Sequence, residues 1–346
     1  LTPGPSLVYL AGLHFHSSER PVIAVFTPGA PVAIALPELE MQKLAGLPYP
    51  VRSFSYGEEP STWPETFKAV IESAGLQRVR VGVEPTRLRY LELSLVLPHL
   101  QDGQLAPAGH VLASLRMQKD ETEISAIRQA VHIAEIALQN TLPLVRPGMS
   151  EKELAAELVL QLLRCGADAE LPFAPIVSSG FNSANPHAVP SDKRLIPGEL
   201  LVIDWGANAD GYCSDLTRTF AIGEVEAEYT RIAAIVLEAN QAGREVVRNG
   251  VSAQAVDAAA RQVIEAHGYG AYFTHRTGHG IGLEGHEDPY IRAGNDLHLV
   301  PGMTFTVEPG IYLPGRGGVR IEDNILVTLE GGETLSSLDR ELRVIA

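Results

Sequence analysis

Five side chains of the kinds that bind hard divalent metals lie in the second half of the 346-residue sequence, each in a short apolar or glycine-rich context. They are Asp204, Asp215, His279, Glu308 and Glu322. Four carboxylates and one imidazole are too few ligands for two separate closed sites. They suit two ions that share bridging carboxylates and leave room for a water molecule, an arrangement that makes hydroxide near neutral pH and stabilises charge on a carbonyl oxygen. The pattern therefore predicts a hydrolase.

The ligand types narrow the choice of metal. Hard oxygen donors with one histidine and no thiolate suit Mn, Co, Zn or Fe(II) better than a structural zinc site built from cysteines. Any one of these acidic residues alone would be read as a solvated surface group, because acidic side chains are mostly exposed. The full ordered set in matching contexts favours a metal site instead.

The two aspartates flank a turn sequence, Asn208-Ala-Asp-Gly211. Apolar runs stand on either side of this turn, at residues 200–203 and 216–220. Such runs around an Asp-Gly turn are typical of a β-hairpin. We therefore expect Asp204 and Asp215 to lie close together across adjacent strands.

The strings around these residues resemble the pita-bread metallopeptidases, the family of methionine aminopeptidase, aminopeptidase P and prolidase. The matching strings are Asp204-Trp-Gly-Ala, Gly211-Tyr-Cys-Ser-Asp215-Leu-Thr-Arg-Thr, His275-Arg-Thr-Gly-His279-Gly-Ile-Gly, Val307-Glu308-Pro-Gly and Arg320-Ile-Glu322-Asp. The resemblance implies a dinuclear site in which Asp204 binds one ion, while His279 and Glu308 bind the other. Asp215 and Glu322 bridge both ions. Manganese is the metal expected first, with cobalt or zinc as alternatives.

The resemblance also implies roles for residues around the metals. A metal-bridging hydroxide attacks the scissile carbonyl, and Glu308 takes its proton and passes it toward the leaving nitrogen. His187 contacts the substrate, and His286 helps to hold the tetrahedral intermediate, as expected of an oxyanion donor. Arg320 hydrogen-bonds the metal carboxylates. His275 has the same motif support, as a pocket-forming residue or a support for the ligands.

Two members of the family compete for the assignment. Prolidase cleaves Xaa-Pro dipeptides, whereas aminopeptidase P removes the first residue of longer Xaa-Pro peptides. Both need a pocket for the proline ring, which we expect to involve Phe173, Ile176 and His187. Creatinase and the non-catalytic binding modules that share the fold lose metal ligands that are all present here, and methionine aminopeptidase lacks an N-terminal domain of this kind.

Recognition of the far end of the substrate separates the two candidates. A dipeptidase must bind a free carboxylate, which suits the planar donor fork of an arginine. The segment containing Glu19-Arg20 resembles the N-terminal loop of short prolidases, so we expect Arg20 to bind this carboxylate across a homodimer interface. The plain alternative is that Arg20 pairs with a nearby carboxylate of its own chain. We predict a prolidase, with aminopeptidase P as the alternative.

The elements that must position these residues fall into two domains. In the N-terminal third, β-rich runs at 22–26, 32–36 and 79–83 alternate with helical stretches at 38–44, 63–74 and 87–97, which is typical of a small α/β domain. A long amphipathic helix is expected over 119–144. The fold class is therefore α/β (α+β), with a creatinase-like domain at 1–112 and a pita-bread catalytic domain at 113–346. The sequence resembles the family only after its usual first helix and strand.

Composition narrows the partners. The chain has 27 Lys and Arg against 42 Asp and Glu, a net charge of −15, which argues against nucleic acid as a partner. Cys165 and Cys213 do not form a disulfide framework. Proline and glycine interrupt the longest apolar stretch, at 22–36, so we expect no membrane span. With no secretory signal in view, the cytoplasm is the expected location.

Overall fold

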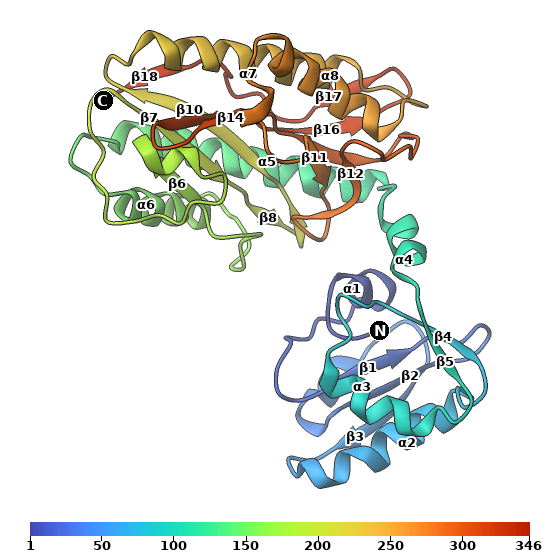
Figure 1. The fold of residues 1–346 in the computed structure, drawn as a ribbon. Coiled ribbons are helices and arrows are strands. Elements are labelled where there is room, and N and C mark those ends of the chain that lie inside the picture. Colours follow the sequence, from blue (N-terminus) through green and yellow to red (C-terminus); the bar gives the residue numbers. More distant parts are fainter. The chain divides into compact units, whose positions relative to one another are not determined.

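The computed structural model describes residues 1–346, which form two compact units, Leu1–Arg116 and Met117–Ala346. Figure 1 shows that each unit combines helices with its own strands, so the expected fold class is confirmed. The units divide four residues beyond the expected boundary at 112, because Gly109–Arg116 forms a single helix, α4, that a boundary at 112 would cut. None of the helices is both long and apolar enough to cross a bilayer.

The first unit is built around two small groups of strands. In chain order its elements are α1 Pro5–Ala11, β1 Ile23–Val25, β2 Val32–Pro37, η1 Glu38–Leu44, β3 Val51–Tyr56, η2 Pro60–Thr62, α2 Trp63–Ser73, β4 Arg80–Val83, α3 Tyr90–Val96, η3 Leu97–His99, β5 Gln104–Pro107 and α4. Strand β1 is antiparallel to β2 and β3 is parallel to it, while β4 and β5 form a parallel pair. All three expected strands are present; of the expected helices, the one at 38–44 is a 3₁₀ helix.

The second unit holds most of the strands. Its elements are α5 Glu121–Thr141, η4 Leu142–Leu144, α6 Glu151–Arg164, β6 Ile176–Ser179, η5 Gly180–Ala184, β7 Glu199–Trp205, β8 Asn208–Ala209, β9 Tyr212–Cys213, β10 Leu216–Ile222, α7 Ala227–Glu245, α8 Ala253–Ala266, η6 Gly270–Tyr272, β11 Gly278–Gly280, β12 Glu287–Ile291, β13 Thr304–Val307, β14 Gly310–Leu313, β15 Gly317–Arg320, β16 Asp323–Val327, β17 Gly332–Thr334 and β18 Arg343–Ile345. Two larger sheets result, in the strand orders β18-β10-β7-β6 and β12-β11-β13-β16-β17.

These strands lie between two pairs of helices. In Figure 1, α7 and α8 run along one side of the second unit, and α5 and α6 run along the other. The first pair packs on a core that includes Leu200 and Ile311, and the second on a core that includes Ile203 and Trp205. Because both faces are covered, every residue of β10 is buried. A polar side chain on such a strand must therefore find a partner inside the protein.

Helices α5 and α6 begin at capping boxes. The Asp120 side chain accepts from the backbone amides of Thr122 and Glu123, and Glu123 returns a bond to the Asp120 amide. Ser150 and Glu153 form the same motif at the start of α6. Reciprocal bonds of this kind satisfy amides that the first turn leaves unpaired, so they fix where each helix starts. The long helix expected over 119–144 is observed as α5 followed by η4.

The hairpin expected around Asn208–Gly211 is confirmed. Strands β7 and β10 are antiparallel, and β8 and β9 extend the hairpin to its tip. At the tip, Asp210 and Gly211 both have positive φ, 51° and 80°. Two positive φ values at the centre of a two-residue loop match the right-handed twist of the flanking strands. The local Asp-Gly sequence therefore sets the register that aligns the two aspartate-bearing strands.

Candidate metal centre

Strand β7 directs Asp204 away from the core beneath α5 and α6. Its neighbours Ile203 and Trp205 belong to the core beneath α5 and α6, and the indole of Trp205 donates to the Ala134 carbonyl at 2.8 Å. Side chains alternate along a strand, so Asp204 points to the opposite face. Thr217 of β10 is its cross-strand partner and lies on that same face. The face carries polar groups although it is buried.

Asp215 directly precedes β10, and the second large sheet supplies the other three candidate ligands. His279 lies in β11, Glu308 directly follows β13, and Glu322 directly precedes β16. A bridge between Thr217 and Glu322 connects this sheet to β10. Strand β11 comes so near to β13 that a Cβ on Gly278 would stand 1.8 Å from the Thr306 carbonyl oxygen. Glycine is therefore required beside His279 for the two strands to meet.

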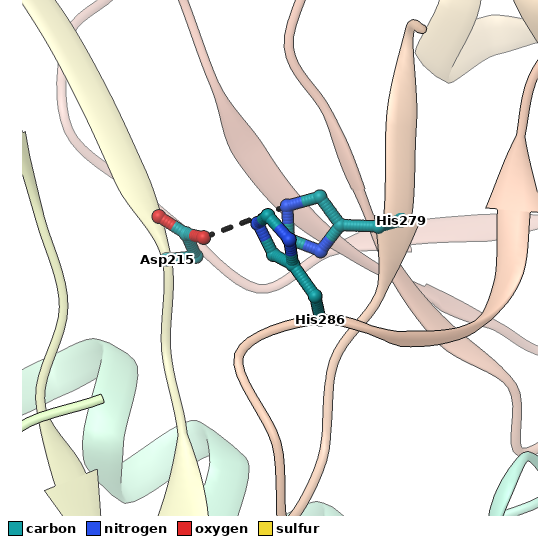
Figure 2. Close-up of side chains that lie close together, drawn as sticks. All are labelled: Asp215, His279 and His286. Atoms are coloured by element: carbon teal, nitrogen blue, oxygen red, sulfur yellow. Dashed lines mark ion pairs between the residues drawn. The ribbon is translucent and has the colours of Figure 1, made fainter. Parts of the chain in front are cut away.

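The five residues expected from the sequence to bind metal converge in this region. Three sets have ligand atoms within 4.8 Å of one another; they are Asp204 with Asp215 and Glu322, His279 with Glu308 and Glu322, and Asp215 with His279 and His286. Glu322 is common to the first two sets. Figure 2 shows the third, with the His279 and His286 rings side by side and facing Asp215. Two sets of ligands that share a carboxylate are what two neighbouring ions require.

Hydrogen bonding fixes which nitrogen of His279 faces the carboxylates. Its Nδ1 lies 3.1 Å from the Gly280 carbonyl oxygen, which can only accept, so Nδ1 carries the proton. Nε2 is then unprotonated and carries a lone pair. It lies 3.3 Å from Glu308 Oε1 and 3.6 Å from Asp215 Oδ2. Lone pairs facing one another across such distances leave a place for a cation. A backbone bond of this kind is how proteins orient metal-binding histidines.

Asp204 supports the same conclusion from the other side of the centre. Its Oδ2 accepts from the Arg320 guanidinium at 2.5 Å, whereas its Oδ1 is buried and has no hydrogen-bond partner. A buried carboxylate oxygen without a partner is costly. A divalent cation at this position would satisfy it. The donor set, oxygen-rich with one imidazole, suits manganese, cobalt, zinc or iron(II).

The electrostatics of the cluster also favour positive charge. Burial, followed by the nearby carboxylates of Glu322, Asp204 and Glu308, raises the pKa of Asp215 well above its usual value. Burial is likewise the main cause that raises the pKa of Glu322 well above the ordinary range and the pKa of Glu308 to about 7. Arg320 opposes these shifts. One arginine cannot balance four carboxylates, so the residues fit two divalent ions.

Arg320 links the carboxylates to groups that the sequence did not single out. Its Nε donates to the Thr217 hydroxyl at 3.0 Å, and Thr217 in turn donates to Glu322 Oε2 at 2.6 Å. Its Nη1 donates to the Tyr312 hydroxyl at 3.0 Å. Thr217 could have been found from the sequence, because it stands two residues after Asp215 and alternation puts it on the same face. Tyr312 has no such local signal.

His275 lies in this network. Its Nδ1 is 2.7 Å from the Arg276 carbonyl oxygen, so it carries the proton, and its Nε2 accepts from the Tyr312 hydroxyl at 2.9 Å. Burial lowers the pKa of His275 to about 4, with Arg320 as the next cause. Nδ1 is also 3.9 Å from Glu308 Oε2. His275 therefore lies directly behind the ligands as a neutral imidazole.

The other two candidate histidines lie at the edge of the cluster. The ring of His286 is 3.8 Å from that of His279, centroid to centroid, and it is exposed. His187 is also exposed and lies in the loop after η5, near enough to Asp204 to be among the groups that oppose the rise in the pKa of that carboxyl, which burial mainly causes. The loop is tied to the cluster because Arg320 donates to the Pro186 carbonyl at 3.2 Å.

The remaining expected substrate residues differ in position. Ile176 of β6 is the cross-strand partner of Asp204, so the two side chains share a face. Phe173, just before β6, is half-buried. Arg20 belongs to the first unit, where its guanidinium donates to Glu58 at 2.9 and 3.2 Å and to Glu19 at 2.8 Å. Within this chain, Arg20 thus makes the plain carboxylate pairing that was the alternative to substrate binding.

Comparison with known proteins agrees with this architecture. Residues 125–329 match the metallopeptidase family M24, and residues 1–118 match the creatinase/prolidase N-terminal domain. Over 354 aligned positions, the chain is 39% identical to a probable dipeptidase, PepE, of Mycobacterium tuberculosis, covering 100% of this chain and 91% of the relative.

Solved structures show the same similarity. A prolidase from Thermococcus sibiricus superposes with a TM-score of 0.94 at 34% identity, covering 99% of this chain and 93% of the other. An X-Pro aminopeptidase from Thermotoga maritima superposes with a TM-score of 0.83, also at 34% identity, covering 98% and 94%. With its metal-binding residue types gathered in the matched region, the chain belongs to metallopeptidase family M24, with a creatinase/prolidase N-terminal domain.

Proposed function

We propose that this protein is a prolidase, a dinuclear metal-dependent enzyme that hydrolyses the Xaa-Pro bond of dipeptides. The observation that carries the proposal is the pair of ligand sets that share Glu322. The similarity to proteins described as dipeptidase and prolidase supports the choice of substrate. A non-catalytic role would not require five buried or half-buried ligand side chains to converge.

In this proposal Asp204 would hold one ion, His279 and Glu308 would hold the other, and Asp215 and Glu322 would be shared between the two. When bound, two divalent ions polarise the substrate carbonyl and lower the pKa of a water molecule so that it can attack near neutral pH. Manganese is the first candidate metal, because the donors are mostly hard oxygens.

The protein's own groups complete the chemistry. Glu308, at the edge of the cluster with its side chain 14% exposed, accepts the proton of the nucleophile and passes it to the leaving nitrogen. His286, which accepts from Arg276 through Nδ1 at 3.2 Å, has its Nε2 proton available to donate to a developing oxyanion. Arg320 holds Asp204 and, through Thr217, Glu322 in their binding orientations.

The substrate pocket is proposed to lie beside Asp204. Ile176 shares a face with that residue and offers an apolar contact to the proline ring, together with the half-buried Phe173. His187, held near the cluster by the Pro186–Arg320 bond, contacts the substrate on the open side. Tyr312 and His275 act from behind, by fixing Arg320 and the backbone next to Arg276.

An aminopeptidase P activity on longer Xaa-Pro peptides is the second candidate. The similarity to the Thermotoga X-Pro aminopeptidase favours it, since that protein also covers nearly the whole chain. Both candidates use the same metal chemistry and differ in the group that they accept after the proline. Specificity at that position, rather than at the metals, therefore decides between them.

The deciding experiment compares two peptides. Metal-free enzyme is reconstituted with manganese, and the hydrolysis of Leu-Pro is compared with that of Leu-Pro-Gly. Cleavage of the dipeptide alone is the expected result. Preference for the tripeptide would establish the aminopeptidase, and failure to cut either peptide with Mn, Co or Zn would contradict the dinuclear hydrolase itself.

A further inference from the structure

We infer that Arg276 binds the free carboxylate of the dipeptide substrate, an assignment that rests on the proposed dipeptidase function. Arg276 forms no ion pair within the chain. One amino group, Nη2, donates to His286 Nδ1 at 3.2 Å, and the guanidinium lies over the ring of Tyr290, with Cζ 4.4 Å from the ring centroid. A half-buried arginine without a carboxylate is free to take one from a ligand.

Arg276 lies one side chain beyond the metal cluster. His286 separates the guanidinium from His279, whose ring lies 3.8 Å from that of His286. In an Xaa-Pro dipeptide, the scissile carbonyl and the free carboxylate are one residue apart, about 3.8 Å between successive Cα atoms. A carbonyl held at the metal cluster thus leaves the carboxylate one side chain away from it, which is where Arg276 stands.

A cation suits this place. Two divalent ions would offset the carboxylates of Asp204, Asp215, Glu308 and Glu322, so the metal-loaded cluster has little excess positive charge to hold the anionic end of a dipeptide, and a nearby arginine supplies that charge. An arginine has a planar fork of donors that matches a carboxylate with two parallel bonds. Tyr290 supports one face of that fork through a cation–π contact and so limits its freedom before substrate arrives.

The other arginines near the cluster or expected from the sequence are engaged. The donors of Arg320 go to Asp204, Thr217, Tyr312 and the Pro186 carbonyl. Arg20 is held by two glutamates of its own unit. Arg276 is therefore the better candidate for reading the carboxylate, and it does so without a second subunit.

The test compares substrates that differ only in the charge at the far end. Wild type and the Arg276→Gln variant, both loaded with manganese, are assayed on Leu-Pro and on Leu-Pro amide. We expect kcat/KM for Leu-Pro to fall by roughly 10- to 100-fold in the variant, mainly through KM, because a bond to a charged group is lost. Turnover of the neutral amide should change by less than about threefold on the same reasoning. Arg276→Lys keeps the positive charge but lacks the planar fork of donors. Its kcat/KM for Leu-Pro should lie between that of the wild type and that of Arg276→Gln.

Two control variants sharpen the outcome. Arg292→Gln removes an exposed arginine two residues beyond Tyr290 and should leave both substrates unaffected. An equal loss on dipeptide and amide in Arg276→Gln would mean that the residue acts only through His286, and would overturn the inference. A selective loss in Arg20→Gln but not in Arg276→Gln would overturn it as well.

The substrate preference of the wild type tests the proposed dipeptidase function independently of the Arg276 variants. A manganese-loaded wild type that prefers Leu-Pro amide or Leu-Pro-Gly to Leu-Pro refutes both the dipeptidase and the carboxylate-binding role. A wild type that prefers Leu-Pro, with a variant that does not discriminate as expected, refutes only the assignment of Arg276. Equal metal content and equal melting temperature establish that the variants are folded.

Discussion

Arg320 and Asp204 are 116 residues apart in the sequence, yet the guanidinium of one bonds the carboxylate of the other within the buried centre of the second unit. The contact joins the end of β15 to β7. Only Oδ2 of Asp204 is used in this bond, whereas Oδ1 is buried and has no hydrogen-bond partner. Arg320 thus fixes the aspartate through one oxygen and leaves the other for the proposed metal.

Replacement of Arg320 should disable the metal centre. In Arg320→Ala the Asp204 charge is left buried and unpaired, so we expect the free energy of unfolding to fall by about 3–5 kcal/mol. In Arg320→Lys the charge remains but the bonds to Thr217 and Tyr312 cannot all be made, and kcat should fall by roughly 10- to 100-fold. Urea unfolding, bound metal by mass spectrometry and steady-state kinetics measure these effects.

A matched control exists on the surface. Arg316 also pairs with a glutamate, Glu226, but both side chains are about half exposed. Pairs of this kind contribute little to stability because water and salt screen them. Arg316→Ala should therefore leave metal content and melting temperature near those of the wild type; a loss as large as that of Arg320→Ala would show that charge removal alone is responsible.

Removal of the metal should destabilise the protein. The ligands repel one another without cations, and any ion that binds only the folded chain stabilises it by mass action, about 2.7 kcal/mol when its concentration is 100 times the dissociation constant. The melting temperature measured by calorimetry should therefore drop after chelation and return with manganese.

The variant Asp215→Asn tests whether repulsion between the carboxylates destabilises the metal-free protein. Removing one of the clustered carboxylates relieves like-charge contact with Glu322, Asp204 and Glu308. Metal-free Asp215→Asn should thus be at least as stable as metal-free wild type, but manganese should no longer raise its melting temperature. A metal response equal to that of the wild type would exclude Asp215 as a ligand.

Glu151 is expected to position the loop that carries His187. This fully buried carboxylate, in the first turn of α6, accepts from the amide and hydroxyl of both Ser179 and Ser191 and from the Asn182 side chain. In Glu151→Gln an NH₂ group would face some of these donors, so we expect a loss of about 2–4 kcal/mol of unfolding free energy.

Activity and metal content of Glu151→Gln together show whether Glu151 positions the His187 loop or the metal ligands. Dipeptide turnover by Glu151→Gln should fall by roughly tenfold or more while bound metal stays constant, because misplacing a substrate-contacting group slows the reaction. Glu157→Gln, on the same helix but partly exposed, serves as the comparison. Loss of bound metal in Glu151→Gln would show that Glu151 supports the metal ligands, and would contradict a role limited to the His187 loop.

A buried ion pair should support the loop that carries His286. Lys119 Nζ lies 2.6 Å from Glu287 Oε1, and both side chains are almost completely buried. Gly282 packs against the pair so closely that a Cβ there would stand 2.5 Å from Glu287 Oε1. Lys119→Met removes a charged partner from a buried carboxylate, so it should cost about 3–5 kcal/mol of unfolding free energy.

A double-mutant cycle measures the coupling of this pair. Lys119→Met, Glu287→Gln and the double variant are compared by urea unfolding. Because the second change removes the charge whose partner the first removed, the double variant should lose less stability than the two single variants together. Simple additivity would mean that the two side chains do not depend on each other.

The sequence predicted the parts of the site that depend on local signals. The Asp-Gly turn specifies the hairpin that aligns Asp204 with β10, and alternation then sets the face on which that side chain points. The amphipathic period over 119–144 similarly predicted the long helix that is observed as α5 followed by η4. Each of these features depends on residues within a few positions of one another, so it can be predicted from the sequence without knowledge of the tertiary structure.

Contacts between residues far apart in the sequence could not be predicted from local signals. Nothing near Arg20 in the sequence indicates that Glu58 occupies its donors, and nothing near Arg276 indicates that Tyr290 supports its guanidinium. The hydroxyl of Tyr312 reaches His275 across 37 residues. Pairings of this kind arise from how the strands pack, and the residue types alone permit many partners.

The distribution of the ligands over separate strands also sets when the centre can form. The hairpin brings two aspartates together through nearby residues, whereas Glu322 reaches them only after the second sheet has docked. Closing long segments of chain is entropically costly and slow. We therefore expect the full set of candidate ligands to come together late in folding, and under the proposed function high-affinity metal uptake by a newly made chain would report the arrival of the native fold.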